Sequence, residues 1–81
     1  MLIDLHTHTL LSDGSLIVAE QLRRAEIQGY DYIGITDHCD FSNIEQIVSQ
    51  TIKGCQAFND NSNNLKALPG VEITHVHPKD I

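Results

Sequence analysis

Two histidines near the start of the chain, His6 and His8, are separated by one residue and stand at the end of a short apolar run. If that run is a strand, side chains two residues apart point to the same face, and the two imidazoles converge. A carboxylate follows in Asp13, although Asp13-Gly14 alone would be ordinary turn chemistry. Imidazole and carboxylate ligands suit Zn, Mn or Fe, so this stretch predicts half of a metal site.

Groups of the same kind follow two later apolar stretches and could supply the other half. Asp37 and His38 come directly after one stretch, and Glu72 follows Pro69-Gly70 in the next. A carboxylate can bridge two ions, and two-metal sites with ions about 3.5–4 Å apart activate water in phosphoryl transfer. We therefore predict His38 and Glu72 as further ligands, and Asp37 as a catalytic residue that orients His38 or a water.

The elements that must position these side chains follow from hydrophobic periodicity. The pattern predicts an α/β chain in the order β-α-β-α-β, with parallel strands joined by helices. The carboxyl ends of parallel strands meet at one edge, where such folds place their chemistry. The predicted elements are a strand at Leu2–His6, a helix from Leu16 to Gln28 closed by Gly29, a strand at Tyr30–Thr36, a helix from the capping box Ser42–Glu45 to about Phe58, and a strand within Leu65–Thr74 that is best formed after Pro69-Gly70.

Composition excludes several classes of protein. The 81 residues carry 5 Lys+Arg against 11 Asp+Glu, and the formal charge of −6 argues against a nucleic-acid backbone as partner. No run approaches the length of a membrane span, and no signal peptide precedes the first strand. Cys39 and Cys55 form no CxxC pattern, and we expect Cys39 to be a small loop residue. A cytoplasmic location is the resulting expectation.

Three motifs in order resemble one family. Asp4-Leu5-His6-Thr7-His8 with Ser12-Asp13-Gly14, then Gly34-Ile35-Thr36-Asp37-His38, then Pro69-Gly70-Val71-Glu72 are similar to the N-terminal part of the polymerase and histidinol phosphatase (PHP) family. The resemblance implies a distorted (β/α)7 TIM-like barrel with a two- or three-metal centre. It also implies hydrolysis of a phosphate ester, most simply of a small molecule, by metal-activated water.

Carried over by position, the resemblance assigns each ligand a place. His6 and His8 would hold one ion, Glu72 would bridge to a second, and Asp13 and His38 would hold a third or outer ion. Family members continue with further strands and ligands, so we interpret residues 1–81 as a single, truncated PHP domain. Such a piece could self-associate or pair with the missing C-terminal part.

Two other functions stay open at this point. One is an inactive metal-binding fragment or interaction piece, because the later ligands of the family are missing. The other is an amidohydrolase-type barrel, which also has an HxH after its first strand but matches the second and third motifs less well. His75 and His77 form a second HxH that aligns with no family ligand, and surface or loop histidines are the better interpretation.

Overall fold

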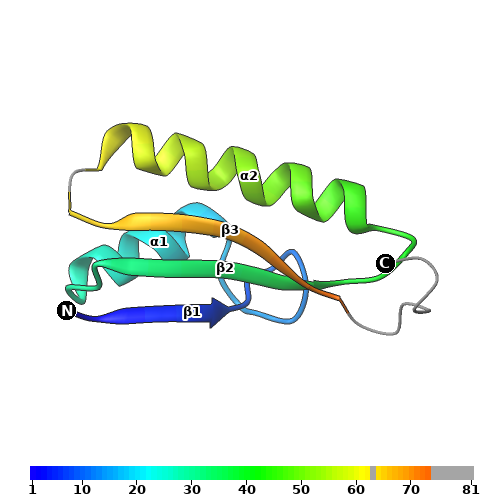
Figure 1. Cartoon of the computed structure of the whole chain (residues 1–81), viewed down its shortest axis with the longest axis horizontal. Coiled ribbons are helices and arrows are strands. Elements are labelled where there is room, and N and C mark those ends of the chain that lie inside the picture. The colour runs from blue at the N-terminus through cyan, green and yellow to red at the C-terminus, as the bar shows by residue number, and fades with distance from the viewer. Residues whose placement is uncertain (63, 74–81) are drawn as a thin grey trace.

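The computed structural model describes residues 1–62 and 64–73, and its element order is the predicted β-α-β-α-β (Figure 1). Three parallel strands form one sheet in the order β1-β2-β3. This is the arrangement expected of the N-terminal part of a PHP TIM-like barrel. The elements are β1 (Ile3–Thr7), α1 (Val18–Ile27), β2 (Tyr32–Cys39), α2 (Ile44–Asn61) and β3 (Lys66–Ile73).

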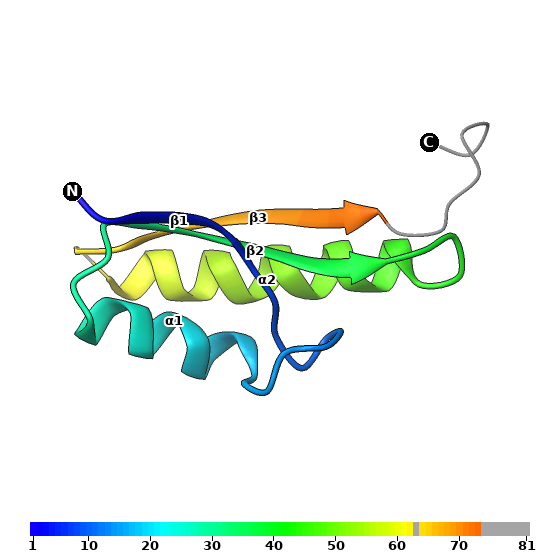
Figure 2. The same ribbon diagram turned by 90° about the horizontal axis from the view of Figure 1, so that it is seen from below.

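Both helices lie on one face of the sheet (Figure 2), and the core forms between the two layers. On α1, Leu22 and Ala25 are buried as their helical spacing predicts, and Val18 packs against the same cluster. From the sheet, Ile33 and Ile35 point into this core. The other face of the sheet carries no helix among the described residues, and we call it the open face.

The central strand runs further than the sequence pattern predicts. β2 pairs with β3 without interruption as far as Cys39, so Asp37, His38 and Cys39 belong to the strand. Cys39 is 3% exposed, and its predicted place in a loop was wrong. Because side chains alternate along a strand, Ile33, Ile35, Asp37 and Cys39 are buried beneath the helices, whereas His38 belongs to the open face.

Strand β1 contains one irregularity in its pairing with β2. Asp4 pairs with Ile33 and Thr7 pairs with Ile35, so three steps along β1 match two along β2. Such a bulge inserts one extra residue and bends the strand. Side chains support the backbone here, because Thr7 Oγ1 donates to the Gly34 carbonyl at 2.6 Å.

The remaining differences lie at element ends. Ser42 does not cap α2 as predicted, because Asn43 is the N-cap residue and makes no side-chain capping bond. Ser42 Oγ donates instead to Asp40 Oδ1 at 2.5 Å, and the backbone N–H of Asp40 donates to Asn43 Oδ1 at 2.9 Å. The side chains of Ser42 and Asn43 therefore stabilise the turn before α2 instead of capping the helix.

Helix α2 continues to Asn61 beyond the predicted end at Phe58, while α1 ends as predicted before Gly29, whose φ is +87°. β3 is paired along its whole length rather than mainly after Pro69-Gly70. Proline is tolerated there because β3 has a neighbouring strand on one side only within the described part of the sheet. Among the described residues, no helix has the length and apolar character needed to cross a membrane.

Candidate metal centre

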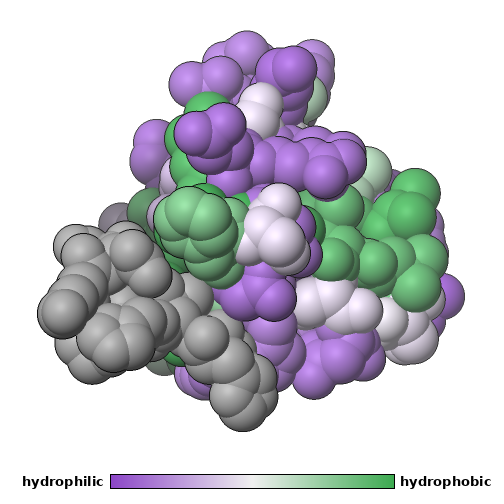
Figure 3. All heavy atoms as spheres, turned by 90° about the vertical axis from the view of Figure 1, so that its right-hand side faces the viewer, coloured by the Kyte–Doolittle hydropathy of each residue, from purple (hydrophilic) through white to green (hydrophobic). Residues whose placement is uncertain are grey.

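The five predicted metal ligands come together at the carboxyl edge of the sheet. His6 belongs to β1, His8 and Asp13 lie in the segment after it, His38 belongs to β2 and Glu72 to β3. His38 and Glu72 are direct partners in the β2–β3 ladder, which places them side by side. Figure 3 faces this end of the molecule and shows hydrophilic and apolar side chains mixed across it.

One group of potential ligands consists of His6, His8 and Glu72. His6 Nε2 lies 3.0 Å from Glu72 Oε1, and His8 Nε2 lies 3.8 Å from Glu72 Oε2. The two imidazoles are themselves close, with 3.1 Å between their Nε2 atoms. Three donor atoms from two strand ends thus face a common point.

A second group consists of His8, Asp13 and His38. His8 Nδ1 lies 2.7 Å from Asp13 Oδ1, and His38 Nε2 lies 3.2 Å from Asp13 Oδ2. His38 Nδ1 also lies 2.5 Å from Glu72 Oε2, which links the two groups. His8 belongs to both groups and presents a different ring nitrogen to each.

His8, which both groups share, is less exposed to solvent than His6 in one group and Asp13 in the other. The His8 side chain is 22% exposed, whereas His6 and Asp13 on either side of it are 62% and 63% exposed. Desolvation raises the pKa of the Asp13 carboxyl, but the hydrogen bond with His8 and the charges of His8 and His38 outweigh it and leave that pKa below its usual value. Asp13 is therefore ionised at neutral pH, as a metal ligand must be.

The donor set fits a divalent cation. Within each group the potential ligand atoms all lie within 4.8 Å of one another. Each group combines two imidazole nitrogens with one carboxylate oxygen. This mixture is typical of Zn, Mn and Fe sites rather than of Ca²⁺ or Mg²⁺ sites, which consist mainly of oxygen ligands.

Asp37, predicted to be catalytic, lies on the other side of the strand from its neighbour His38. It is 0% exposed, and its carboxylate accepts hydrogen bonds from Thr9 and Ser12 in the loop after β1. Sequence reasoning assigned no role to these two hydroxyl residues. The signal was nonetheless present, since an aspartate in step with Ile33 and Ile35 is a buried carboxylate that needs donors.

The loop between β1 and α1 is held in a tight turn that brings Asp13 back to His8. The N–H of Gly14 donates to the Thr9 carbonyl at 2.8 Å. A Cβ atom at Gly14 would lie 2.3 Å from the His8 carbonyl oxygen, so a side chain there would push the loop away. Glycine is thus required where the loop passes the ligand-bearing strand.

His75 and His77 lie outside the described residues.

Comparison with known proteins agrees with this geometry. The family model described as PHP domain matches residues 4–80. The chain therefore belongs to the PHP domain family, whose members are metal-dependent and hydrolase-like.

Two relatives are similar to this chain. It is 42% identical over 81 residues to the uncharacterized protein MJ1295 of Methanocaldococcus jannaschii, and the match covers 100% of this chain and 37% of that protein. It is 32% identical over 75 residues to the DNA polymerase/3'-5' exonuclease PolX of Bacillus subtilis, and that match covers 86% of this chain and 13% of PolX. The chain thus spans well under half the length of either relative. No solved structure matches it.

Proposed function

We propose that this protein contributes the N-terminal ligands of a metal-dependent phosphoesterase that hydrolyses a phosphate ester with an activated water. One observation carries the proposal: five side chains with metal-binding chemistry converge at the carboxyl edge of the sheet, in two groups that share His8. Membership of the PHP domain family supports the same class of reaction.

The residues of the site divide into two sets of ligands. His6, His8 and Glu72 would hold one divalent ion, and Asp13 and His38 would contribute to a second position beside it. We propose Zn, Mn or Fe as the ion. When bound, such ions make water a nucleophile at neutral pH and offset negative charge on the phosphate oxygens.

The charge of the site explains why the substrate would depend on the ions. With its imidazoles neutral, as metal ligation requires, the site carries the negative charges of Asp13 and Glu72, which alone would repel a phosphate group. Divalent ions reverse that sign. We propose a small-molecule phosphate ester as substrate, because the formal charge of −6 disfavours the backbone of a nucleic acid.

A second candidate function is a metal-binding piece without activity of its own. The chain spans 37% of the length of MJ1295, and within the described residues β1 and β3 each have a neighbouring strand on one side only. Exposed strand edges pair readily with further strands. In this second candidate function, activity would need such strands, from a second copy or from the C-terminal part of the family fold. The motif match favours either function over an amidohydrolase-type reaction.

The test is phosphate release from an aryl phosphate by the purified chain after loading with Zn²⁺ or Mn²⁺. We expect metal-dependent turnover that His8→Ala abolishes, with no turnover of a matched aryl amide or a single-stranded oligonucleotide. Metal binding without turnover would favour the inactive piece. A wild-type chain that holds no metal by elemental analysis would refute both functions.

A further inference from the structure

The buried carboxylate of Asp37 is fully engaged by the loop that follows β1. Oδ1 accepts hydrogen bonds from the Thr9 N–H at 2.5 Å and from Ser12 Oγ at 2.6 Å, and Oδ2 accepts one from Thr9 Oγ1 at 2.7 Å. A carboxylate that is 0% exposed is costly to bury unless donors compensate it, and here each donor comes from the same short loop. We call Thr9, Ser12 and Asp37 the loop clasp.

Ser12 extends the clasp to the backbone of β2. Its hydroxyl hydrogen is used toward Asp37, and its oxygen accepts a hydrogen bond from the His38 N–H at 3.1 Å. Ser12 therefore joins the loop that carries Asp13 to the strand residue that carries the His38 imidazole. Its hydroxyl is the only part of its side chain that can make this connection.

Each member of the clasp is next in sequence to one ligand of the same group. Thr9 follows His8, Ser12 precedes Asp13, and Asp37 precedes His38. By contrast, Glu72 in the other group has no clasp residue as a sequence neighbour. Because Asp13 and His38 belong to this group alone, the clasp is placed to set the distance between these two ligands.

We propose that Asp37 is a positioning residue that acts through Ser12 to fix Asp13 relative to His38, and so tunes the ion position that these two ligands serve. This inference rests on the proposed metal site but assigns Asp37 a role away from the reacting atoms. A merely structural aspartate would stabilise the fold and affect both groups of ligands alike. A positioning residue instead changes the metal affinity of one group of ligands only.

The test measures Co²⁺ affinity, by the visible absorption of the bound ion, in two backgrounds. His6→Ala leaves the group of His8, Asp13 and His38, and Asp13→Ala leaves the group of His6, His8 and Glu72. Ser12→Ala should weaken Co²⁺ binding about 10- to 100-fold in the first background, the usual cost of losing a partner that orients a ligand. In the second background the change should stay within about twofold, as for sites that do not couple.

Two matched variants serve as controls. Ser15→Ala removes a hydroxyl from an exposed residue of the same loop and should leave Co²⁺ affinity unchanged in both backgrounds. Ser12→Thr keeps the hydroxyl and should restore most of the affinity that Ser12→Ala loses. Equal weakening in both backgrounds, or none in either, would overturn the positioning role.

A second readout needs no ion and separates this inference from the proposed function. Hydrogen exchange at the His38 amide should be faster in Ser12→Ala than in Ser15→Ala, because the Ser12 oxygen is its acceptor. A wild-type chain that binds no Co²⁺ overturns the proposed function, while the amide still reports on the clasp. Unchanged exchange at His38 would overturn the clasp even in a chain that binds the ion.

Discussion

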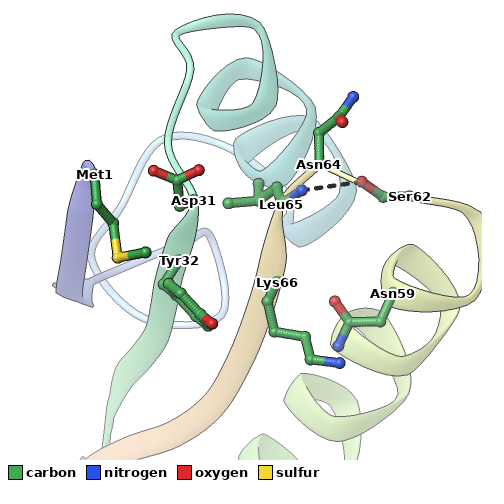
Figure 4. Close-up of a pocket in the computed structure, with 8 residues that line it drawn as sticks. All are labelled: Met1, Asp31, Tyr32, Asn59, Ser62, Asn64, Leu65 and Lys66. Carbon is green, nitrogen blue, oxygen red and sulfur yellow. Dashed lines mark hydrogen bonds between the residues drawn. The ribbon is translucent and has the colours of Figure 1, made fainter.

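The two edges of the sheet both carry polar side chains, but these side chains have different partners. At the amino edge a cavity of about 300 Å³ is lined by residues that include Asp31, Asn59 and Lys66 (Figure 4). Several polar groups there bond to backbone: Asp31 Oδ2 accepts from the Leu2 N–H at 3.0 Å, and the Asp31 carbonyl accepts from the Lys66 N–H at 2.9 Å. These bonds tie the starts of the three strands together.

At the carboxyl edge, polar side chains face one another instead. His6, His8 and His38 each lie near a carboxylate oxygen of Asp13 or Glu72. Such convergence of imidazoles and carboxylates does little for folding and is what an ion needs. The difference teaches that several titratable side chains that face a common point, rather than polar side chains as such, distinguish a binding edge from a structural edge.

The largest effect that would test this contrast is on metal affinity, after substitution of His8. His8→Ala removes a ligand from both groups, and we expect Zn²⁺ or Mn²⁺ affinity to fall by more than the roughly 100-fold upper cost of losing an outer partner. His6→Ala removes a ligand from one group only and should cost less. Calorimetric titration measures both, and thermal melts without metal should be nearly unchanged. Loss of the fold in His8→Ala would make the carboxyl edge structural too.

The second largest effect is expected on the free energy of unfolding, at Asn59 beside the amino edge of the sheet. Asn59 Nδ2 donates to the Ala67 carbonyl at 2.9 Å, and Asn59 Oδ1 accepts from the Ala67 N–H at 2.8 Å. The side chain thus takes the place of a neighbouring strand beside β3. Asn59→Ala should lower the free energy of unfolding by about 1–3 kcal/mol, because two backbone groups lose their partner.

Urea denaturation measures this change, with Asn61→Ala as the matched control. Asn61 is exposed and makes one hydrogen bond to the Ala57 carbonyl within its own helix, so its removal should stay within about 0.5 kcal/mol. Metal affinity should be unchanged in both variants. A weakened ion site in Asn59→Ala would show that the two edges are coupled.

The smallest effect is a pH dependence near the amino edge. The hydrogen bond from Ser62 Oγ lowers the pKa of Glu26, partial desolvation opposes it, and Arg23 adds to it. A folded pKa below the unfolded value of about 4.5 contributes stability above that pH, which is lost as pH falls through the folded pKa. Glu26→Gln should therefore lose less stability than wild type as pH falls below 4.5.

Melting temperatures across that acid range measure the effect, with Glu45→Gln, exposed on α2, as the control. The control should keep the wild-type dependence on pH. Parallel curves for wild type and Glu26→Gln would mean that Ser62 and Glu26 do not link the ends of the two helices in solution.

The sequence was sufficient to predict the element order and that the candidate metal ligands lie close together. Histidines and carboxylates at the ends of apolar runs identify one edge of a parallel sheet, and His8 and Glu72 come together there as that rule predicts. Helix α1 was equally predictable, because Leu22 and Ala25 keep a helical period and Gly29 ends it.

What could not be predicted depends on contacts between distant segments. Ser12 and Asp37 are 25 residues apart, and β2 continues past Thr36 because it pairs with β3 as far as Cys39. The start of α2 was missed for a local reason, since Asp40 competes for the Ser42 hydroxyl. The roles predicted for Asp37 and the five ligands remain predictions until metal binding is measured.

The bulge in β1 has a consequence for how this protein can change length. A deletion of Leu5 or His6 would restore even pairing with β2, and the ladder itself would gain regularity. Thr7 would keep Ile35 as its partner, so the later side chains would stay on their present faces and His8 would stay at the site. We therefore expect the strand to accept the loss of Leu5, which supplies no ligand, whereas the loss of His6 would remove a ligand from a strand that still pairs.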